Sequence, residues 1–129
     1  MMDSVNKVIL IGRLGREPEL RWTPNANAIC NVSMATNTKW KDKNDGPQER
    51  TDWHNLVIWG KLAEEFKTTA FKGSLVYIEG SLQTRSWEKG GEKRYITEIN
   101  VRNFINLESQ KNTSKEKEEI KSDLLEELG

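Results

Sequence analysis

The stretch from 51 to 61 alternates between two kinds of side chain at every second position, which is the period of a β-strand. On one face, Leu56 and Ile58 are apolar and suit a core. On the other face stand two tryptophans, Trp53 and Trp59, with small, polar or β-branched residues between them. The alternation therefore predicts a strand that is apolar on its inner face and aromatic on its outer face.

Five other segments have the β-branched and apolar content of strands, and turn residues bound them. They are 5–12, a short strand within 17–22, 28–40, 75–87 and 94–107. In the last of them the pattern predicts one apolar side, formed by Tyr95, Ile99, Val101, Ile105 and Leu107. Gly12 and Gly15 predict a sharp bend of the kind that closes small barrels. Gly90-Gly91 predicts a tight hairpin, and the polar segment 41–50 a mobile hairpin loop.

One helix is predicted over 62–71, because Leu62, Phe66 and Ala70 recur at helical spacing and Lys72-Gly73 follows as a stop. The order is then three long strands, a helix and two long strands. That order predicts an all-β fold, a five-stranded OB-type Greek-key barrel with one α-helix between strands 3 and 4.

Few residues in this chain could form a catalytic site or a metal site. Cys30 is the only cysteine and His54 the only histidine among 129 residues. No internal disulfide or cysteine-based metal site can form, and a metalloenzyme or a histidine-assisted nucleophile would depend on one imidazole. We expect no enzyme activity, no cofactor and no metal, with Cys30 as a small buried apolar residue.

Charge divides the chain although its formal net charge is zero. Residues 1–108 hold 16 basic and 14 acidic side chains, a balance of +2, and residues 109–129 hold 4 and 6, a balance of −2. All the aromatic residues lie in the first part. We expect a folded domain over 1–108 and a flexible acidic tail over 109–129, in which Ile120, Leu124, Leu125 and Leu128 fit a short amphipathic helix. No run of 18 apolar residues and no signal-peptide pattern is present, which favours a soluble, cytoplasmic, nucleoid-associated protein.

Five tryptophans in a chain of low hydrophobicity are interleaved with Lys and Arg. Aromatic faces beside cations suit unpaired nucleic acid, because bases stack on the rings while phosphates contact the charges. We expect Trp22 to pack at the rim of the barrel, within reach of a base.

Several motifs in order resemble the bacterial single-stranded DNA-binding proteins. They are Val5-Asn6-Lys7-Val8-Ile9-Leu10-Ile11-Gly12, Thr51-Asp52-Trp53-His54, Gly60-Lys61-Leu62-Ala63-Glu64 and Val76-Tyr77-Ile78-Glu79-Gly80. The resemblance implies an OB fold that protects single-stranded DNA in replication, recombination and repair, commonly as a homotetramer. It assigns base stacking to Trp40, Trp53, Trp59 and Trp87, and phosphate contacts to Lys7, Lys43, Lys61, Lys72 and Arg85. It assigns a subunit interface to His54 and Tyr77. From the residues themselves, we expect the strand with His54, Leu56 and Ile58 and the first strand to supply apolar surface for assembly.

The tail departs from this family, whose members end in an acidic tip with a Pro-Phe pair, whereas this chain ends Leu-Gly. The sequence therefore does not predict whether this tail recruits replication and repair proteins. A family member from a phage, a plasmid or a divergent bacterial lineage would account for the different tail. Two alternatives to a single-stranded DNA binder remain. One is an OB-fold adaptor of a replication complex that binds mainly protein; the other is RNA binding, because no residue selects for or against a 2′-hydroxyl.

Overall fold

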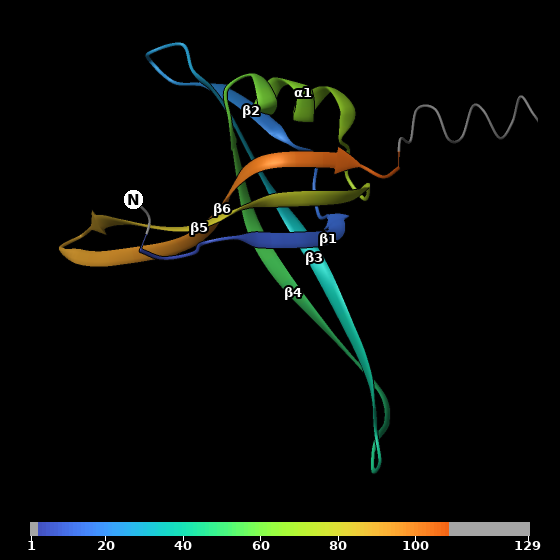
Figure 1. Ribbon diagram of the computed structural model, residues 1–129. Helices are drawn as coiled ribbons and strands as arrows, with labels where there is room; N and C mark the ends of the chain where they lie inside the picture. The colour runs from blue at the N-terminus through green and yellow to red at the C-terminus, as the bar shows by residue number, and fades with distance from the viewer. Residues whose placement is uncertain (1–2, 109–129) are drawn as a thin grey trace, which may run out of the picture.

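The computed structural model describes residues 3–108, which form a β-barrel with one helix (Figure 1). The elements in chain order are β1 (Val8–Leu14), β2 (Glu19–Trp22), β3 (Ala28–Asp42), β4 (Gly46–Trp59), α1 (Lys61–Thr69), β5 (Leu75–Lys89) and β6 (Glu92–Asn106). Within this range the only helix has nine residues and is too short to cross a membrane. The predicted tail over 109–129 lies outside the described residues, so the predicted domain boundary stays a prediction.

The sheet runs in the order β1-β5-β6-β4-β3-β2, and β1 also pairs with β3. That second pairing, between Arg13 and Ala35 and between Leu14 and Met34, closes five strands into a barrel. The short strand β2 pairs with β3 alone and is not one of these five strands. The predicted OB-type barrel, with the helix between its third and fourth long strands, is confirmed. Helix α1 covers one end, where the rings of Phe66 and Phe104 meet edge to face at 5.0 Å between centroids.

Two glycines permit the closure because their neighbours occupy the space of a side chain. A Cβ at Gly12 would lie 2.3 Å from the carbonyl oxygen of Ala35, where β1 reaches β3. A Cβ at Gly80 would lie 2.1 Å from the carbonyl oxygen of Asn100, where β5 crosses β6. Distances this short exclude any larger residue without a shift of the backbone. The predicted bend at Gly12 thus corresponds to the closure of the barrel.

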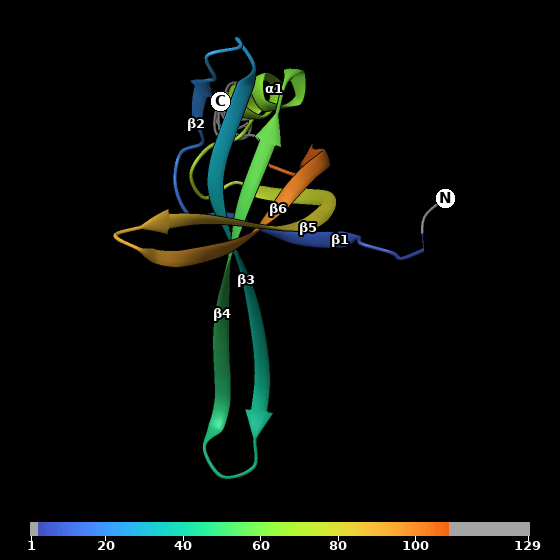
Figure 2. The ribbon, with the colours of Figure 1, turned by 90° about the vertical axis from the view of Figure 1, so that its left-hand side faces the viewer.

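Two hairpins extend beyond the barrel in different directions (Figures 1 and 2). One is the hairpin of β3 and β4, which we call the β3–β4 arm. Its strands pair continuously, from Ile29 opposite Trp59 out to Asp42 opposite Gly46. The predicted loop over 41–50 is therefore wrong in extent: polar residues continue both strands, and only 43–45 connect them. A hairpin beyond the barrel has no buried face, so polarity there does not indicate a loop. The β5–β6 hairpin turns at Gly90 and Gly91, as predicted, and both have positive φ.

The predicted apolar side of the last strand is also wrong in part. Ile99 and Val101 are buried, but Ile105 and Leu107 are exposed, and Phe104 packs against the core instead. The pairing explains the change. Gly80 lies opposite Val101 while Glu79 lies opposite Asn103, so one extra residue bulges out of β6 and reverses which side chains face inward.

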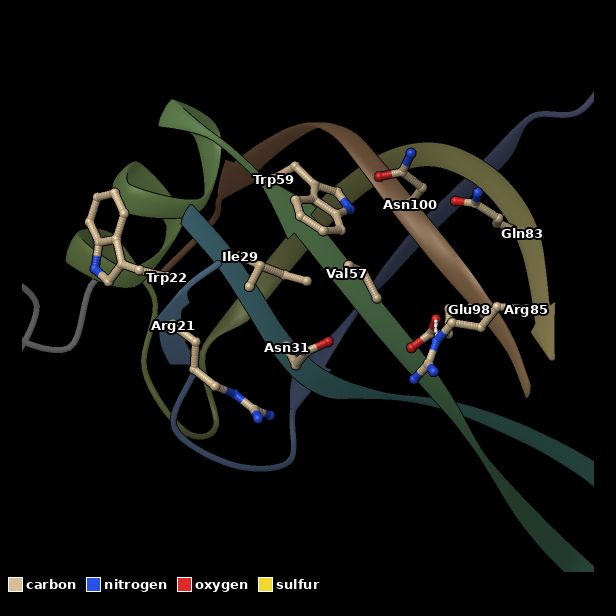
Figure 3. A pocket seen from close by; sticks show the side chains of 10 residues that line it. All are labelled: Arg21, Trp22, Ile29, Asn31, Val57, Trp59, Gln83, Arg85, Glu98 and Asn100. Carbon is tan, nitrogen blue, oxygen red and sulfur yellow. Dashed lines mark hydrogen bonds and ion pairs between the residues drawn. The ribbon is translucent and has the colours of Figure 1, made fainter. Parts of the chain in front are cut away.

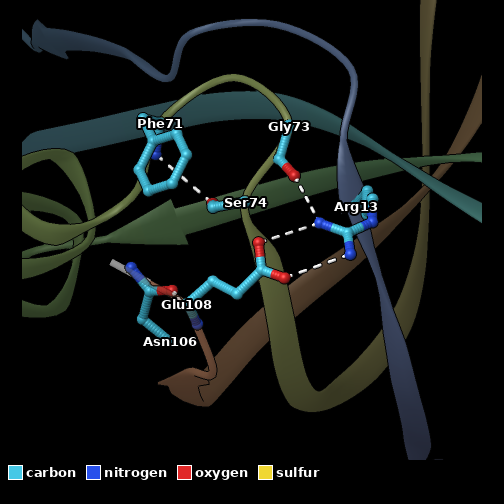
Figure 4. A network of polar contacts seen from close by, with 6 residues as sticks. All are labelled: Arg13, Phe71, Gly73, Ser74, Asn106 and Glu108. Atoms are coloured by element: carbon cyan, nitrogen blue, oxygen red, sulfur yellow. Dashed lines mark hydrogen bonds and ion pairs between the residues drawn. The ribbon is translucent and has the colours of Figure 1, made fainter. Parts of the chain in front are cut away.

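A polar network fixes the end of β6 against the barrel (Figure 4). The Arg13 guanidinium donates to both carboxylate oxygens of Glu108 at 2.9 and 3.1 Å, and to the carbonyl oxygen of Gly73 at 2.9 Å. The hydrogen bond to Glu108 raises the pKa of Arg13, whose guanidinium is charged in any case. The chain therefore leaves the barrel at a defined point, beside the loop that follows α1.

Candidate nucleic-acid interface

An open groove crosses the outer face of the barrel over β2, β3, β4, β6 and β5 (Figure 3). Its floor includes a row of side chains from three adjacent strands, Asn31, Val57 and Asn100. Trp22 and Arg21 line one end, Arg85 and Glu98 the other, and Trp59 lies between them. The groove thus offers ring faces, amides and two guanidinium groups, which are the groups that unpaired nucleotides contact.

The outer face of β4 carries the predicted pair of tryptophans. Leu56 and Ile58 are buried in the core, whereas Trp53 and Trp59 are 61% and 46% exposed, so the predicted division between the two faces is confirmed. The Trp53 ring lies over Gly15, because a Cβ on that glycine would be 2.4 Å from a carbon of the indole. Gly15 therefore leaves room for an aromatic side chain, a role beyond the predicted bend.

Trp40 does not share this face. Trp53 pairs with Ala35, and Trp40 stands five residues further along β3, so the two side chains leave opposite faces of the β3–β4 arm. Trp40 is nonetheless 47% exposed. Four predicted stacking residues are therefore at the surface, but they do not lie on one flat face. Trp87, on the β5–β6 hairpin, lies beneath the guanidinium of Arg85.

The predicted phosphate contacts divide by position. Arg85 lines the groove, and Lys61 follows directly after Trp59 and Gly60. Lys43 stands at the connection of the β3–β4 arm, and Lys72 lies beyond the end of α1, where its backbone N–H donates to Glu17. Lys7 is bound to Glu79 at 2.8 Å, and this hydrogen bond raises its pKa. Of the predicted phosphate contacts, Arg85 alone lines the groove, and Lys7, Lys43, Lys61 and Lys72 lie outside its lining.

Comparison with known proteins supplies the family. The model of the single-strand binding protein family matches residues 5–119. This chain belongs to that family. The fold is similar to an SSB from Plasmodium falciparum in complex with ssDNA, with a TM-score of 0.75 and 33% identity over 84% of this chain and 99% of that one. It is also similar to a deletion variant of the single-stranded DNA binding protein from Thermus aquaticus, with a TM-score of 0.72 and 32% identity. That match covers 82% of this chain and 52% of the other, so this chain spans about half the length of the Thermus protein.

A second exposed surface of this family member is mainly apolar. We define the apolar patch as Ile9, Ile11, Tyr77 and Ile105, on the outer face of β1, β5 and β6, together with Leu107, which follows directly after β6. Ile11, Tyr77 and Ile105 lie in one row across the three strands. The predicted interface residue Tyr77 is thus at the centre of the patch.

His54 lies on a different part of the barrel, at the inner face of the β3–β4 arm. Its Nε2 is 2.8 Å from the Thr36 hydroxyl, and it is half-buried next to the core residue Met34. The expectation that Leu56 and Ile58 supply interface surface is wrong, because both are fully buried inside the barrel. Ile9 and Ile11 of the first strand do reach the surface. The roles of His54 and Tyr77 as interface residues stay predictions.

Cys30 is in the core and burial raises the pKa of its thiol to about 11. The thiol is therefore protonated and shielded from solvent near neutral pH. The prediction of a small buried apolar residue is confirmed.

Sequence reasoning missed Arg21 and Glu98, which both line the groove. Trp22, expected at the barrel rim within reach of a base, is 58% exposed and lines the groove beside Arg21. The alternation of β6 places Glu98 on the same face as Asn100, but only the pairing of β6 with β4 and β5 brings that face to the groove.

Proposed function

We propose that this chain binds single-stranded DNA without sequence preference and protects it during replication, recombination and repair in the cytoplasm. The observation that carries the proposal is the exposure of all five tryptophans, two of them in a groove that also holds Arg21 and Arg85. Exposed indoles expose apolar area to water, and stacked bases would cover it. Membership of the single-strand binding protein family and the likeness to an SSB in complex with ssDNA support the same function.

The proposed binding path follows the groove and continues onto exposed residues beside it. Bases stack on Trp59 in the groove and on Trp53 and Trp87 beyond its lining, while phosphates contact Arg85 and, next to Trp59, Lys61. Trp40 and Lys43 extend the path onto the β3–β4 arm. Ring faces accept any base, so the sequence of the strand has little influence on affinity. A duplex keeps its bases paired and stacked, and offers none of them to the indoles.

Fluorescence titration tests this function. Oligo-dT should quench the intrinsic Trp emission strongly, and duplex DNA of equal length should quench it far less. Raising the salt concentration should weaken binding with a slope of log K against log[salt] of about −0.7 for each neutralised phosphate. Equal quenching by single strand and duplex would contradict the proposal, and oligo-U in place of oligo-dT would show whether RNA binds as well.

We also propose that the chain assembles as a homotetramer, and that the apolar patch is one of its contact surfaces. The patch supports this because aliphatic side chains on three neighbouring strands gain most from a dry, apolar partner. β1 is also an edge over Val8 to Ile11, with unpaired backbone groups on the side away from β5. Light scattering at micromolar concentration should give about four times the chain mass; a monomer would contradict the assembly but leave DNA binding intact.

A further inference from the structure

Arg85 is held by two groups before any nucleic acid binds. Its Nε donates to Oε1 of Glu98 at 2.7 Å, and its guanidinium carbon lies 5.3 Å from the centroid of the Trp87 ring (Figure 3 shows the ion pair). Arg85 thus neutralises a carboxylate and covers one face of an indole at the same time. Both groups belong to the surface that would bind the strand.

Glu98 is placed unlike an ordinary surface carboxylate. Its side chain is 13% exposed, whereas that of Arg85 is 60% exposed. The carboxylate is therefore sunk in the groove wall and the guanidinium reaches over it from β5. Among the ten residues that line the groove, Glu98 is the one acidic side chain.

A fixed carboxylate in an anion-binding groove has a physical consequence. A phosphate that approaches Arg85 has to compete with Glu98 for the guanidinium, and it is repelled by the same carboxylate. If the guanidinium turns toward the phosphate, it leaves both Glu98 and the ring of Trp87. The movement then uncovers a ring face on which a base can stack.

We propose that Glu98 is a latch on Arg85, which limits the affinity for single-stranded DNA and couples one phosphate contact to one stacking site, Trp87. The inference rests on the proposed function and deepens it. Glu98 is a positioning residue here, since it acts on the strand through Arg85.

The test variant is Glu98→Gln, which keeps the shape of the side chain and removes its charge. Binding of dye-labelled oligo-dT is followed by fluorescence anisotropy over a series of salt concentrations. We expect E98Q to bind about threefold to fivefold more tightly than the wild type at low salt, at the upper end of the range for surface ion pairs, because Glu98 is mostly shielded from solvent. The slope of log K against log[salt] should become steeper by up to about 0.7, because one more cation is available to a phosphate.

Two controls separate a latch from general repulsion. Glu88→Gln removes the same charge from the other face of the β5–β6 hairpin and should change affinity by much less. In an Arg85→Gln background, adding E98Q should give little further gain, because the group that it releases is absent. Thermal unfolding of each variant checks the fold, and Glu98→Thr, which suits a strand, replaces E98Q if that variant unfolds.

The outcomes are distinct. A gain in E98Q that disappears in the R85Q background supports the latch. Unchanged or weaker binding by E98Q overturns it, as does an equal gain in E88Q or in the R85Q background. The wild type alone tests the proposed function: if it binds oligo-dT while E98Q shows no gain, the latch fails and single-stranded DNA binding stands.

Discussion

Strand β5 carries two exposed surfaces along one face, and they differ in the kind of side chain. Tyr77 belongs to the apolar patch, with Ile11 and Ile105 at its sides. Eight residues later on the same face, Arg85 belongs to the groove, with Gln83 and Glu98 nearby. The patch places aliphatic side chains around Tyr77, with the Lys7–Glu79 ion pair beside Ile9. The groove combines indoles with amides and guanidinium groups.

The kind of side chain on each surface indicates its binding partner, whereas the exposed fraction alone does not. Ile11 of the patch and Trp22 of the groove are 54% and 58% exposed, so burial would rank them together. Aliphatic side chains gain most from exclusion of water by another apolar surface. Indoles beside amides and cations can bind a ligand that stays partly hydrated. We therefore propose that the patch serves self-association and that the groove binds the nucleic acid, and the predictions below test that separation.

The largest effect should come from removing two rings of the β4 outer face. Trp53→Ala with Trp59→Ala should weaken oligo-dT binding by about 2–6 kcal/mol, because each stacked base contributes about 1–3 kcal/mol. Anisotropy of a labelled oligonucleotide measures this independently of the lost Trp emission. Light scattering should show an unchanged assembly; dissociation of the double variant would contradict the separation of the two surfaces.

Gly80 lies on β5 between the patch and the groove, so its substitution should damage both. Gly80→Ala would place a methyl group 2.1 Å from the carbonyl oxygen of Asn100. We expect a loss of about 1–3 kcal/mol in the free energy of unfolding, as for other overpacked sites. Urea denaturation measures it, and Gly46→Ala, at a turn with open space around it, shows the cost of a positive φ alone. A stability equal to that of the wild type would contradict the close crossing of β5 and β6.

A substitution in the apolar patch that preserves β-strand propensity should weaken self-association. Ile11→Thr retains β-branching but loses apolar area, at a cost of about 1–2 kcal/mol per copy if the side chain is buried between subunits. Dilution in analytical ultracentrifugation should show dissociation at higher protein concentration than for the wild type. Affinity for an oligonucleotide short enough for one groove should not change; a large loss would place Ile11 in the DNA path.

A subtler effect is expected at Gly15, which lies under Trp53. Gly15→Ala should push the indole aside by contact with its ring, and cost up to about 1 kcal/mol in oligo-dT affinity, a fraction of a full stacking contribution. The added methyl group would also lie 2.9 Å from Oγ of Ser33. Stability should change little, because both contacts are to side chains and none is to the backbone. Thermal unfolding and anisotropy together check this, and a variant that loses stability but not affinity would reverse the interpretation.

The last effect is the smallest at neutral pH, where it is absent, and concerns a thiol in the core. Burial raises the pKa of Cys30 from 9.0 to about 11, so the unfolded chain releases this proton first as pH rises. The thiol's contribution to stability is therefore complete below pH 9 and is lost as pH rises from 9 through 11. Urea denaturation of the wild type and Cys30→Ala over this range should show a steeper decline for the wild type. Parallel curves would mean that the thiol is not shielded in the native state.

Local pattern in the sequence determined much of this protein. The alternation over 51–61 placed Trp53 and Trp59 outside and Leu56 and Ile58 inside, Gly90-Gly91 marked the hairpin, and the spacing of Leu62 and Phe66 marked the helix within two residues. These features depend on a residue and its near neighbours in the chain, so periodicity and turn chemistry suffice to predict them.

Features that depend on strand pairing were decided only by the tertiary structure. The register across Gly80 inserts a bulge in β6, which turns Ile105 and Leu107 outward and forms part of the apolar patch. The pairing of the β3–β4 arm puts Trp40 on the face opposite Trp53, although both were expected to stack bases. The groove itself joins Trp22 to Glu98 across five strands, and it is the packing of β5 beside β6 that sets Glu98 against Arg85. A sequence specifies which side chains alternate along each strand, but the partner strand determines where that alternation shifts and which distant faces meet.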